Sequence, residues 1–176
     1  PLIDYIESLV ESGSLTARMH YGCDGWVVHH LSDIWGFTTP ADGVWGIWPM
    51  GAAWLCQHVW EHYAFTGDTV FLQTRGYPLM KGAAEFILDY LTPDKNGYLV
   101  TNPSHSPENA FITPDGQKAM FCVGATMDFE IIHDLFSHCL EAARVLKIDS
   151  EFCGELEQAL RRLPPLKIGR YGQLQE

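Results

Sequence analysis

The sequence predicts a nearly all-α fold, in which helices are joined alternately by short and by long loops. Apolar residues recur at helical spacing along residues 2–12, 51–65, 68–75, 77–91, 126–146 and 150–162. Glycine or proline follows most of these stretches, where helices commonly end. The segments 14–50 and 94–124 lack this period and are rich in glycine and proline. Because loops of this length are usually functional, we expect them to gather at one end of the helices and to carry the site.

Glycines and a capping aspartate divide the first half of the chain. Gly13 is expected to end the first helix, and Trp26–Val28 is a candidate short strand within the first long loop. The second helix should stop at Gly67. Asp68 then has the side chain to cap a short helix that runs to about Arg75.

The second half has longer helices with clearer ends. A helix over 77–91 should end at Thr92-Pro93, because the residue before a proline disfavours helical geometry. Tyr98–Val100 is a possible strand. Thr126 is expected to cap the longest helix, whose apolar residues cover two faces and therefore suit packing on both sides. Ser150 is expected to cap the last helix, which a Pro-Pro pair stops.

Composition restricts the classes of function. The 176 residues suffice for one domain, and 47% hydrophobic with 19% charged residues is typical of a globular protein. The net charge of −11 argues against nucleic acid as a partner, because no basic patch would neutralise a row of phosphates. No apolar run reaches the ~18 residues that a membrane span needs, so we expect none. The five cysteines are widely spaced, which favours free, mostly buried thiols over a disulfide framework or a zinc knuckle.

Glu108 stands in the segment Ser104–Asn109, a loop rich in serine, proline and asparagine. Glycoside hydrolysis commonly needs a carboxylic acid that protonates the leaving oxygen and a second carboxylate opposite it. A partly apolar, aromatic setting would keep such a carboxyl protonated. Glu108 is therefore a candidate general acid, although an ordinary solvated glutamate is the commoner case for a loop.

A second group of candidates lies in and after the run 29–35, within a segment dense in tryptophan and histidine. Sugars are bound by flat apolar faces together with fixed hydrogen-bond donors and acceptors. We therefore assign sugar contacts to His29, His30, Asp33, Trp35 and Trp48. A buried polar network that pins the long loop explains the run 29–35 equally well. Trp45 is expected with Trp48 at a cleft, and Trp54 and Trp60 in the core.

His58, Glu61 and His62 match the pattern H-x-x-E-H, which also marks a class of zinc peptidases. On a helix the two histidines share a face, but a zinc site needs a third ligand. A helical histidine pair that joins a core network is the commoner case. A zinc peptidase is thus an alternative function, whereas the glycosidase interpretation requires no metal and no other cofactor.

Motifs follow one another along nearly the whole chain: Gly25–His30, Trp48–Gly51, Trp54–Tyr63, Phe65–Asp68, Tyr98–Ser104, Ser106–Asn109, Thr126–Asp128 and Gly172–Glu176. In this order they resemble the catalytic domain of glycoside hydrolase family 95. The resemblance implies an all-α, (α/α)6 barrel and removal of terminal 1,2-linked α-L-fucose from oligosaccharides with inversion. It makes Glu108 the general acid and a fucosylated glycan the partner.

The resemblance also implies that part of the machinery lies elsewhere. The family activates its water with asparagines that belong upstream of Pro1 and an aspartate that belongs beyond Glu176. Residues 1–176 are therefore expected to form a single partial domain, a fragment of the barrel that is inactive by itself. The family favours an exported enzyme, which the sequence alone does not establish.

One departure from the family pattern bears on specificity. Leu31-Ser32 stand where family members often have Asn-Thr after the paired histidines. Losing an amide near a sugar site changes which hydroxyl can be recognised, so an α-L-galactosidase of the same family is an alternative. A non-catalytic carbohydrate-binding helical domain is a further one.

Overall fold

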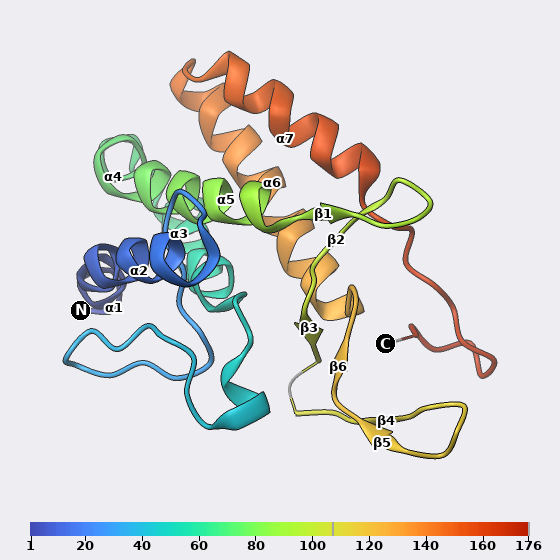
Figure 1. Cartoon of the computed structure of the whole chain (residues 1–176). Helices are drawn as coiled ribbons and strands as arrows, with labels where there is room; N and C mark the ends of the chain where they lie inside the picture. Colours follow the sequence, from blue (N-terminus) through green and yellow to red (C-terminus); the bar gives the residue numbers. More distant parts are fainter. Residues whose placement is uncertain (107, 176) are drawn as a thin grey trace.

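The computed structural model describes residues 1–106 and 108–175, and it is mostly helical with a few short strands (Figure 1). The helical elements are α1 (Leu2–Ser8), α2 (Val10–Thr16), η1 (Ala17–Tyr21), η2 (Gly43–Gly46), α3 (Gly51–Thr66), α4 (Thr69–Phe71), η3 (Leu72–Gly76), α5 (Tyr77–Tyr90), α6 (Thr126–Leu146) and α7 (Ser150–Arg162). The strands pair as antiparallel ribbons: β1 (Thr92–Pro93) with β2 (Leu99–Val100), β3 (Ser104–His105) with β6 (Phe121–Cys122), and β4 (Phe111–Ile112) with β5 (Lys118–Ala119).

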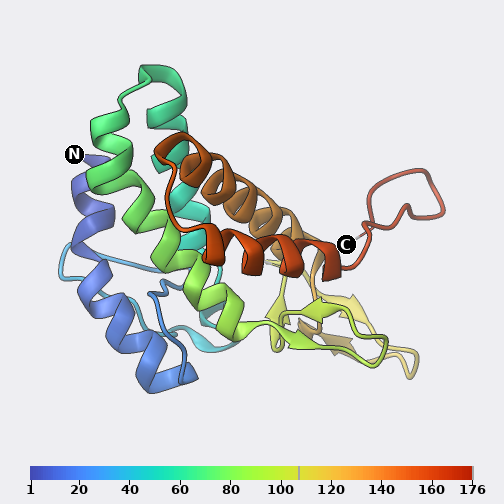
Figure 2. The same cartoon turned by 90° about the horizontal axis from the view of Figure 1, so that it is seen from above.

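The core lies where α3, α5 and α6 pack against one another, and α7 lies along the other side of α6 (Figure 2). Ile132 and Phe136 of α6 and Leu156 of α7 are fully buried there. The prediction that the longest helix packs on two sides is therefore confirmed. No helix in the described part is long and apolar enough to cross a membrane.

The long connections leave the helices on one side of the molecule (Figure 1). The segment between η1 and α3 and the ribbons between α5 and α6 meet there. Their contact is made by the rings of Trp45 in η2 and His105 in β3, whose centroids are 5.7 Å apart. The long loops thus gather at one end, as their composition predicts.

Gly13 does not end the first helix, contrary to the prediction. Helical geometry continues through α2 and η1 to Tyr21, and the left-handed residue that ends it is Gly22, with φ 68°. Gly13 is buried, and a Cβ atom at this position would lie 2.9 Å from the carbonyl oxygen of Val27. This glycine therefore provides room for close packing and does not act as a terminator.

The predicted strand Trp26–Val28 is also wrong: the segment is buried but pairs with no strand in the described part. Its amides donate to helical carbonyls, Trp26 N to Gly82 O at 3.2 Å and Val27 N to Gly13 O at 3.2 Å. The Trp26 indole donates to Leu79 O at 3.0 Å. The segment thus satisfies its buried backbone by lying between α2 and α5.

Two predicted caps are wrong, because the predicted residue is in each case the first residue of the helix and not the residue before it. Thr126 is the first residue of α6, and its hydroxyl donates to Gln175 O at 2.7 Å. Ser150 is the first residue of α7, and Asp149 precedes it. The carboxylate of Asp149 does not cap the helix, because it accepts from Lys81 Nζ at 2.6 Å.

Other predicted boundaries are confirmed. Gly67 ends α3 in the left-handed conformation, with φ 65°. Asp68 caps α4, its carboxylate accepting from Phe71 N at 2.9 Å. The helix predicted for 77–91 is α5, and part of the predicted strand Tyr98–Val100 is β2. The thiols of Cys23, Cys56 and Cys139 are free and buried, as predicted.

We expect Gly13→Ala to destabilise the chain by about 1–3 kcal/mol, because the new methyl group would press on a backbone oxygen. Gly154→Ala is the matched control, since Gly154 is also helical but has open space around it. That change should stabilise by about 0.5–1 kcal/mol, because alanine favours the helix. Urea unfolding followed by tryptophan fluorescence compares the two, and effects of the same sign would contradict the packing role of Gly13.

Candidate active site

Glu108 lies on a tight turn directly after β3, and its side chain is exposed. The turn is closed by hydrogen bonds from Asn109 N to Ser106 O at 2.7 Å and from Asn109 Nδ2 to Ser106 Oγ at 3.0 Å. Ser106 and Asn109 both line a cavity of about 580 Å³, whose other walls include Phe111 and Met120. Glu108 therefore stands in the sequence between two residues of a cavity wall. Pro107, in the middle of the predicted motif, lies outside the described residues, as does Glu176 at the end of the last motif.

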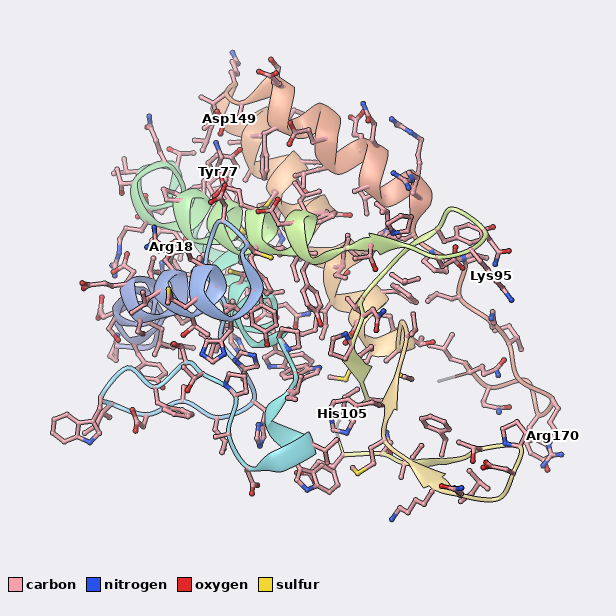
Figure 3. All side chains as sticks on the ribbon, viewed as in Figure 1. Arg18, Tyr77, Lys95, His105, Asp149 and Arg170 are labelled. Atoms are coloured by element: carbon pink, nitrogen blue, oxygen red, sulfur yellow. The ribbon has the colours of Figure 1, made fainter. Side chains whose placement is uncertain are left out.

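His105, in β3 and three residues before Glu108, is not among the predicted site residues (Figure 3). Its side chain is only 1% exposed and its ring meets the edges of Trp45 and Phe121. Among the described residues, neither ring nitrogen has a hydrogen-bond partner. Burial lowers the pKa of His105. A neutral ring offers a ligand one donor and one acceptor.

His30 and Trp48 add two more buried groups without partners in the described part, His30 Nδ1 and Trp48 Nε1. His30 is close enough to His105 to influence its pKa. Trp48 follows η2, whose Trp45 touches His105. Buried polar atoms are almost always hydrogen-bonded in folded proteins, so buried atoms without a partner indicate places where a polar ligand can bind. Among the five predicted sugar contacts, His30 is placed near His105, whereas Trp48 packs against Trp54 of α3 with ring centroids 6.3 Å apart.

His29 has a different environment from its neighbour His30. Its Nδ1 atom lies 2.7 Å from Thr38 O and its Nε2 atom 2.5 Å from the Tyr21 hydroxyl. Because a carbonyl only accepts, Nδ1 carries the proton and Nε2 accepts from Tyr21. Both nitrogens are therefore used in holding the long loop. Burial lowers the pKa of His29 to about 4, and burial raises the pKa of Tyr21 to about 12.

Asp33 and Trp35 lie on the long loop between η1 and η2. The Asp33 carboxylate accepts from Trp35 N at 2.9 Å and from Phe37 N at 3.1 Å, which fixes a turn. The Trp35 side chain is 87% exposed on this turn. The structure does not bring these two residues together with Glu108, and their contact with sugar stays a prediction.

The H-x-x-E-H pattern is exposed on α3. His58 Nδ1 lies 3.9 Å from a Glu61 oxygen, and the His62 ring packs against Phe71 with centroids 4.4 Å apart. Over residues 1–106 and 108–175, no group of three or more His, Cys, Asp or Glu side chains is arranged to hold a metal ion. The pattern therefore lacks the third ligand that zinc needs.

The tryptophans of α3 are less buried than predicted. Trp54 is 41% exposed, so its assignment to the core is wrong. It lines a cavity of about 680 Å³ between α3, α6 and the end of α7, which does not include the Glu108 turn. Trp60 is partly buried and stacks on His138, with centroids 4.8 Å apart. This larger cavity is apolar on most sides, and its Trp54 packs against Trp48, with ring centroids 6.3 Å apart.

The lowered pKa of His29 predicts a loss of stability in acid. Between about pH 6.5 and pH 4 the unfolded chain binds a proton that the folded chain excludes, so the free energy of unfolding is highest above pH 6.5 and falls as the pH drops towards 4. The fall from this residue should reach about 3 kcal/mol. Urea unfolding at about pH 7 and about pH 4 measures it, and His29→Gln should show a smaller difference between the two. His133→Gln, at an exposed site, should keep the full difference, and an unchanged difference in His29→Gln would contradict the assignment.

Comparison with known proteins identifies the family. Residues 1–176 match the glycosyl hydrolase family 95 catalytic domain. The chain is 45% identical to "Alpha-L-fucosidase 2" of Arabidopsis thaliana over 179 residues, covering 100% of this chain and 21% of the relative. It is 35% identical to "Probable alpha-fucosidase A" of Aspergillus niger over 185 residues, covering 100% of this chain and 23% of the relative. The chain thus spans less than a quarter of either relative, and it belongs to glycosyl hydrolase family 95.

Proposed function

We propose that this chain is part of an inverting α-L-fucosidase that removes terminal 1,2-linked α-L-fucose from oligosaccharides, with Glu108 as the general acid. The observation that carries the proposal is the hydrogen-bonded turn from Ser106 to Asn109, in which Glu108 stands in the sequence between two residues that line a cavity. Membership of the family and the names of both relatives support fucose as the sugar.

In this mechanism the Glu108 carboxyl donates its proton to the glycosidic oxygen as the bond from that oxygen to the anomeric carbon breaks. A water molecule attacks the anomeric carbon from the opposite face, and its proton passes to the groups that activate it. The leaving sugar departs as a neutral alcohol, and the released fucose has the inverted configuration. The Glu108 side chain is exposed, so within the described residues it does not have the partly apolar setting expected from the sequence, and its carboxyl is accessible to a substrate and to water.

We further propose that residues 1–176 are a single partial domain, one part of an (α/α)6 barrel. The packing of α3 with α5 and of α6 with α7, together with the long loops at one end, supports this arrangement. The family resemblance assigns the water-activating asparagines and aspartate to regions outside this chain. The chain by itself should therefore be inactive.

We propose that the sugar lies against His30, Trp48 and His105. Their unpartnered donors and acceptors would bond the hydroxyl groups, and the indole would cover an apolar face of the sugar. His29 and Asp33 would act by fixing the loop that carries His30, and Trp35 would contact more distant parts of the glycan. Leu31 is exposed and the Ser32 hydroxyl lies 2.6 Å from the Tyr5 hydroxyl, so these two residues sit beside α1.

Glu108→Gln, made in the full-length protein that carries this sequence, should lower turnover of 2′-fucosyllactose by about 10²–10⁴-fold. Turnover of α-L-fucosyl fluoride should fall far less, because fluoride leaves without a proton. Glu61→Gln, at an exposed position of α3, is the matched control and should leave both rates unchanged. Release of L-fucose is measured for each substrate, and an equal loss on both would count against an acid role for Glu108. A preference for an α-L-galactosyl substrate would instead move the sugar assignment to L-galactose.

Trp48→Phe should raise KM for 2′-fucosyllactose by about 10-fold, since the substitution keeps an apolar ring but removes one hydrogen bond, worth about 1.5 kcal/mol. The rate at saturation should change little, because the contact exists in both the bound substrate and the transition state. Trp60→Phe, on the His138 side of α3, is the control with unchanged KM. A normal KM in Trp48→Phe would place the sugar elsewhere.

A further inference from the structure

Asp128, in the first turn of α6, has a carboxylate that is buried and strongly hydrogen-bonded. Its side chain is 1% exposed. One oxygen, Oδ2, accepts from the Thr101 hydroxyl at 2.6 Å and from the Ser104 hydroxyl at 2.7 Å. Taking a carboxylate out of water is costly unless such bonds and a favourable dipole replace the water. The amino-terminal end of a helix supplies that dipole.

The same few residues hold the whole segment before the Glu108 turn. Ser104 Oγ also accepts from Ala125 N at 2.9 Å, and Thr101 O accepts from Gly124 N at 3.0 Å. On the other side, the Tyr90 hydroxyl donates to Pro103 O at 2.6 Å. Each bond joins the segment 101–104 to the end of α5 or the start of α6. These hydrogen bonds thus fix the segment to α5 and α6, the helices on either side of it in the sequence.

Regular secondary structure alone would not fix this segment. The pairing of β3 with β6 covers two residues on each strand, and a ribbon of that size has little stability of its own. An apolar residue at position 128 would fill the space without the desolvation of a charge, but it would give no directional bonds. The carboxylate sets the position of Ser104, and Glu108 follows four residues later through His105 and the closed turn.

We propose that Asp128 is a positioning residue for the general acid: by holding Thr101 and Ser104 it sets where the Glu108 carboxyl meets the glycosidic oxygen. This inference rests on the proposed role of Glu108. A displacement of about 1 Å at a reacting group can reduce a rate by about 10²-fold. Loss of the network should therefore slow the step that needs the acid and spare a step that does not.

The test compares 2′-fucosyllactose with α-L-fucosyl fluoride in the full-length protein. Asp128→Asn, which removes the charge from the hydrogen bonds, should lower kcat for 2′-fucosyllactose at least about 10-fold and leave kcat for the fluoride within about 2-fold. Glu130→Gln, two residues along α6 and exposed, is the matched control and should change neither. A purely structural role would reduce the folded fraction and so lower both rates together.

A second pair of variants covers the case in which Asp128→Asn does not fold. Thr101→Val removes one hydroxyl donor and should show the same selective loss, while Thr101→Ser restores the donor and should recover most of the rate. Equal losses on both substrates, or no rescue by serine, would overturn the positioning role. The positioning role would also be overturned if the wild type is active and every variant keeps the wild-type ratio of kcat for 2′-fucosyllactose to kcat for the fluoride. A wild type that cleaves neither substrate would instead overturn the proposed function, and this inference with it.

Discussion

The structure depends on one buried, non-helical segment, residues 26–29, around which the helices close. An extended segment has no hydrogen-bonding partners of its own, so its amides must find helical carbonyls that come very near. They do so because glycine faces the segment at several points. A Cβ atom at Gly82 would lie 2.8 Å from the Trp26 ring, and one at Gly51 would lie 2.4 Å from Val28 O. Small residues on α2, α3 and α5 thus allow three helices to pack on one strip of backbone.

This segment continues into the candidate site. Some buried polar groups there are engaged in hydrogen bonds, and others have no partner among the described residues. Thr101, Ser104 and Asp128 form a network with short hydrogen bonds, which gives order to a region almost without regular structure. His105 and Trp48, by contrast, keep buried polar atoms without partners among the described residues. Unsatisfied buried groups reduce the free energy of unfolding, and they persist where a ligand can satisfy them. A hydrogen-bonded residue, Ser104, and an unpartnered one, His105, are therefore adjacent in β3.

The sequence predicts those features that depend on neighbours along the chain. The end of α3 at Gly67, the Asp68 cap and the two packed faces of α6 follow from local spacing, and all are confirmed. The prediction for Gly13 is wrong because the role of this glycine depends on the carbonyl oxygen of Val27, which comes close to it only in the folded chain. Adjacent side chains of an extended chain point opposite ways, so His29 enters a buried network while His30 lies near His105. Hydrophobic periodicity does not predict which of the two histidines is buried in the network. It also does not predict that Asp128 contacts Ser104, because the two residues are 24 positions apart in the sequence.

The hairpin of β4 and β5 closes its own turn, through hydrogen bonds from Gly116 N to Thr113 O at 2.8 Å and from Thr113 N to Gln117 O at 2.9 Å. Its Phe111 and the adjacent Met120 form one wall of the cavity that Ser106 and Asn109 also line. The hydrogen bonds that close the tip join residues 113–117 to one another, so they do not depend on the network around Asp128. A change of length or sequence at this tip would therefore reshape one wall of the cavity and leave the segment 101–104 in place.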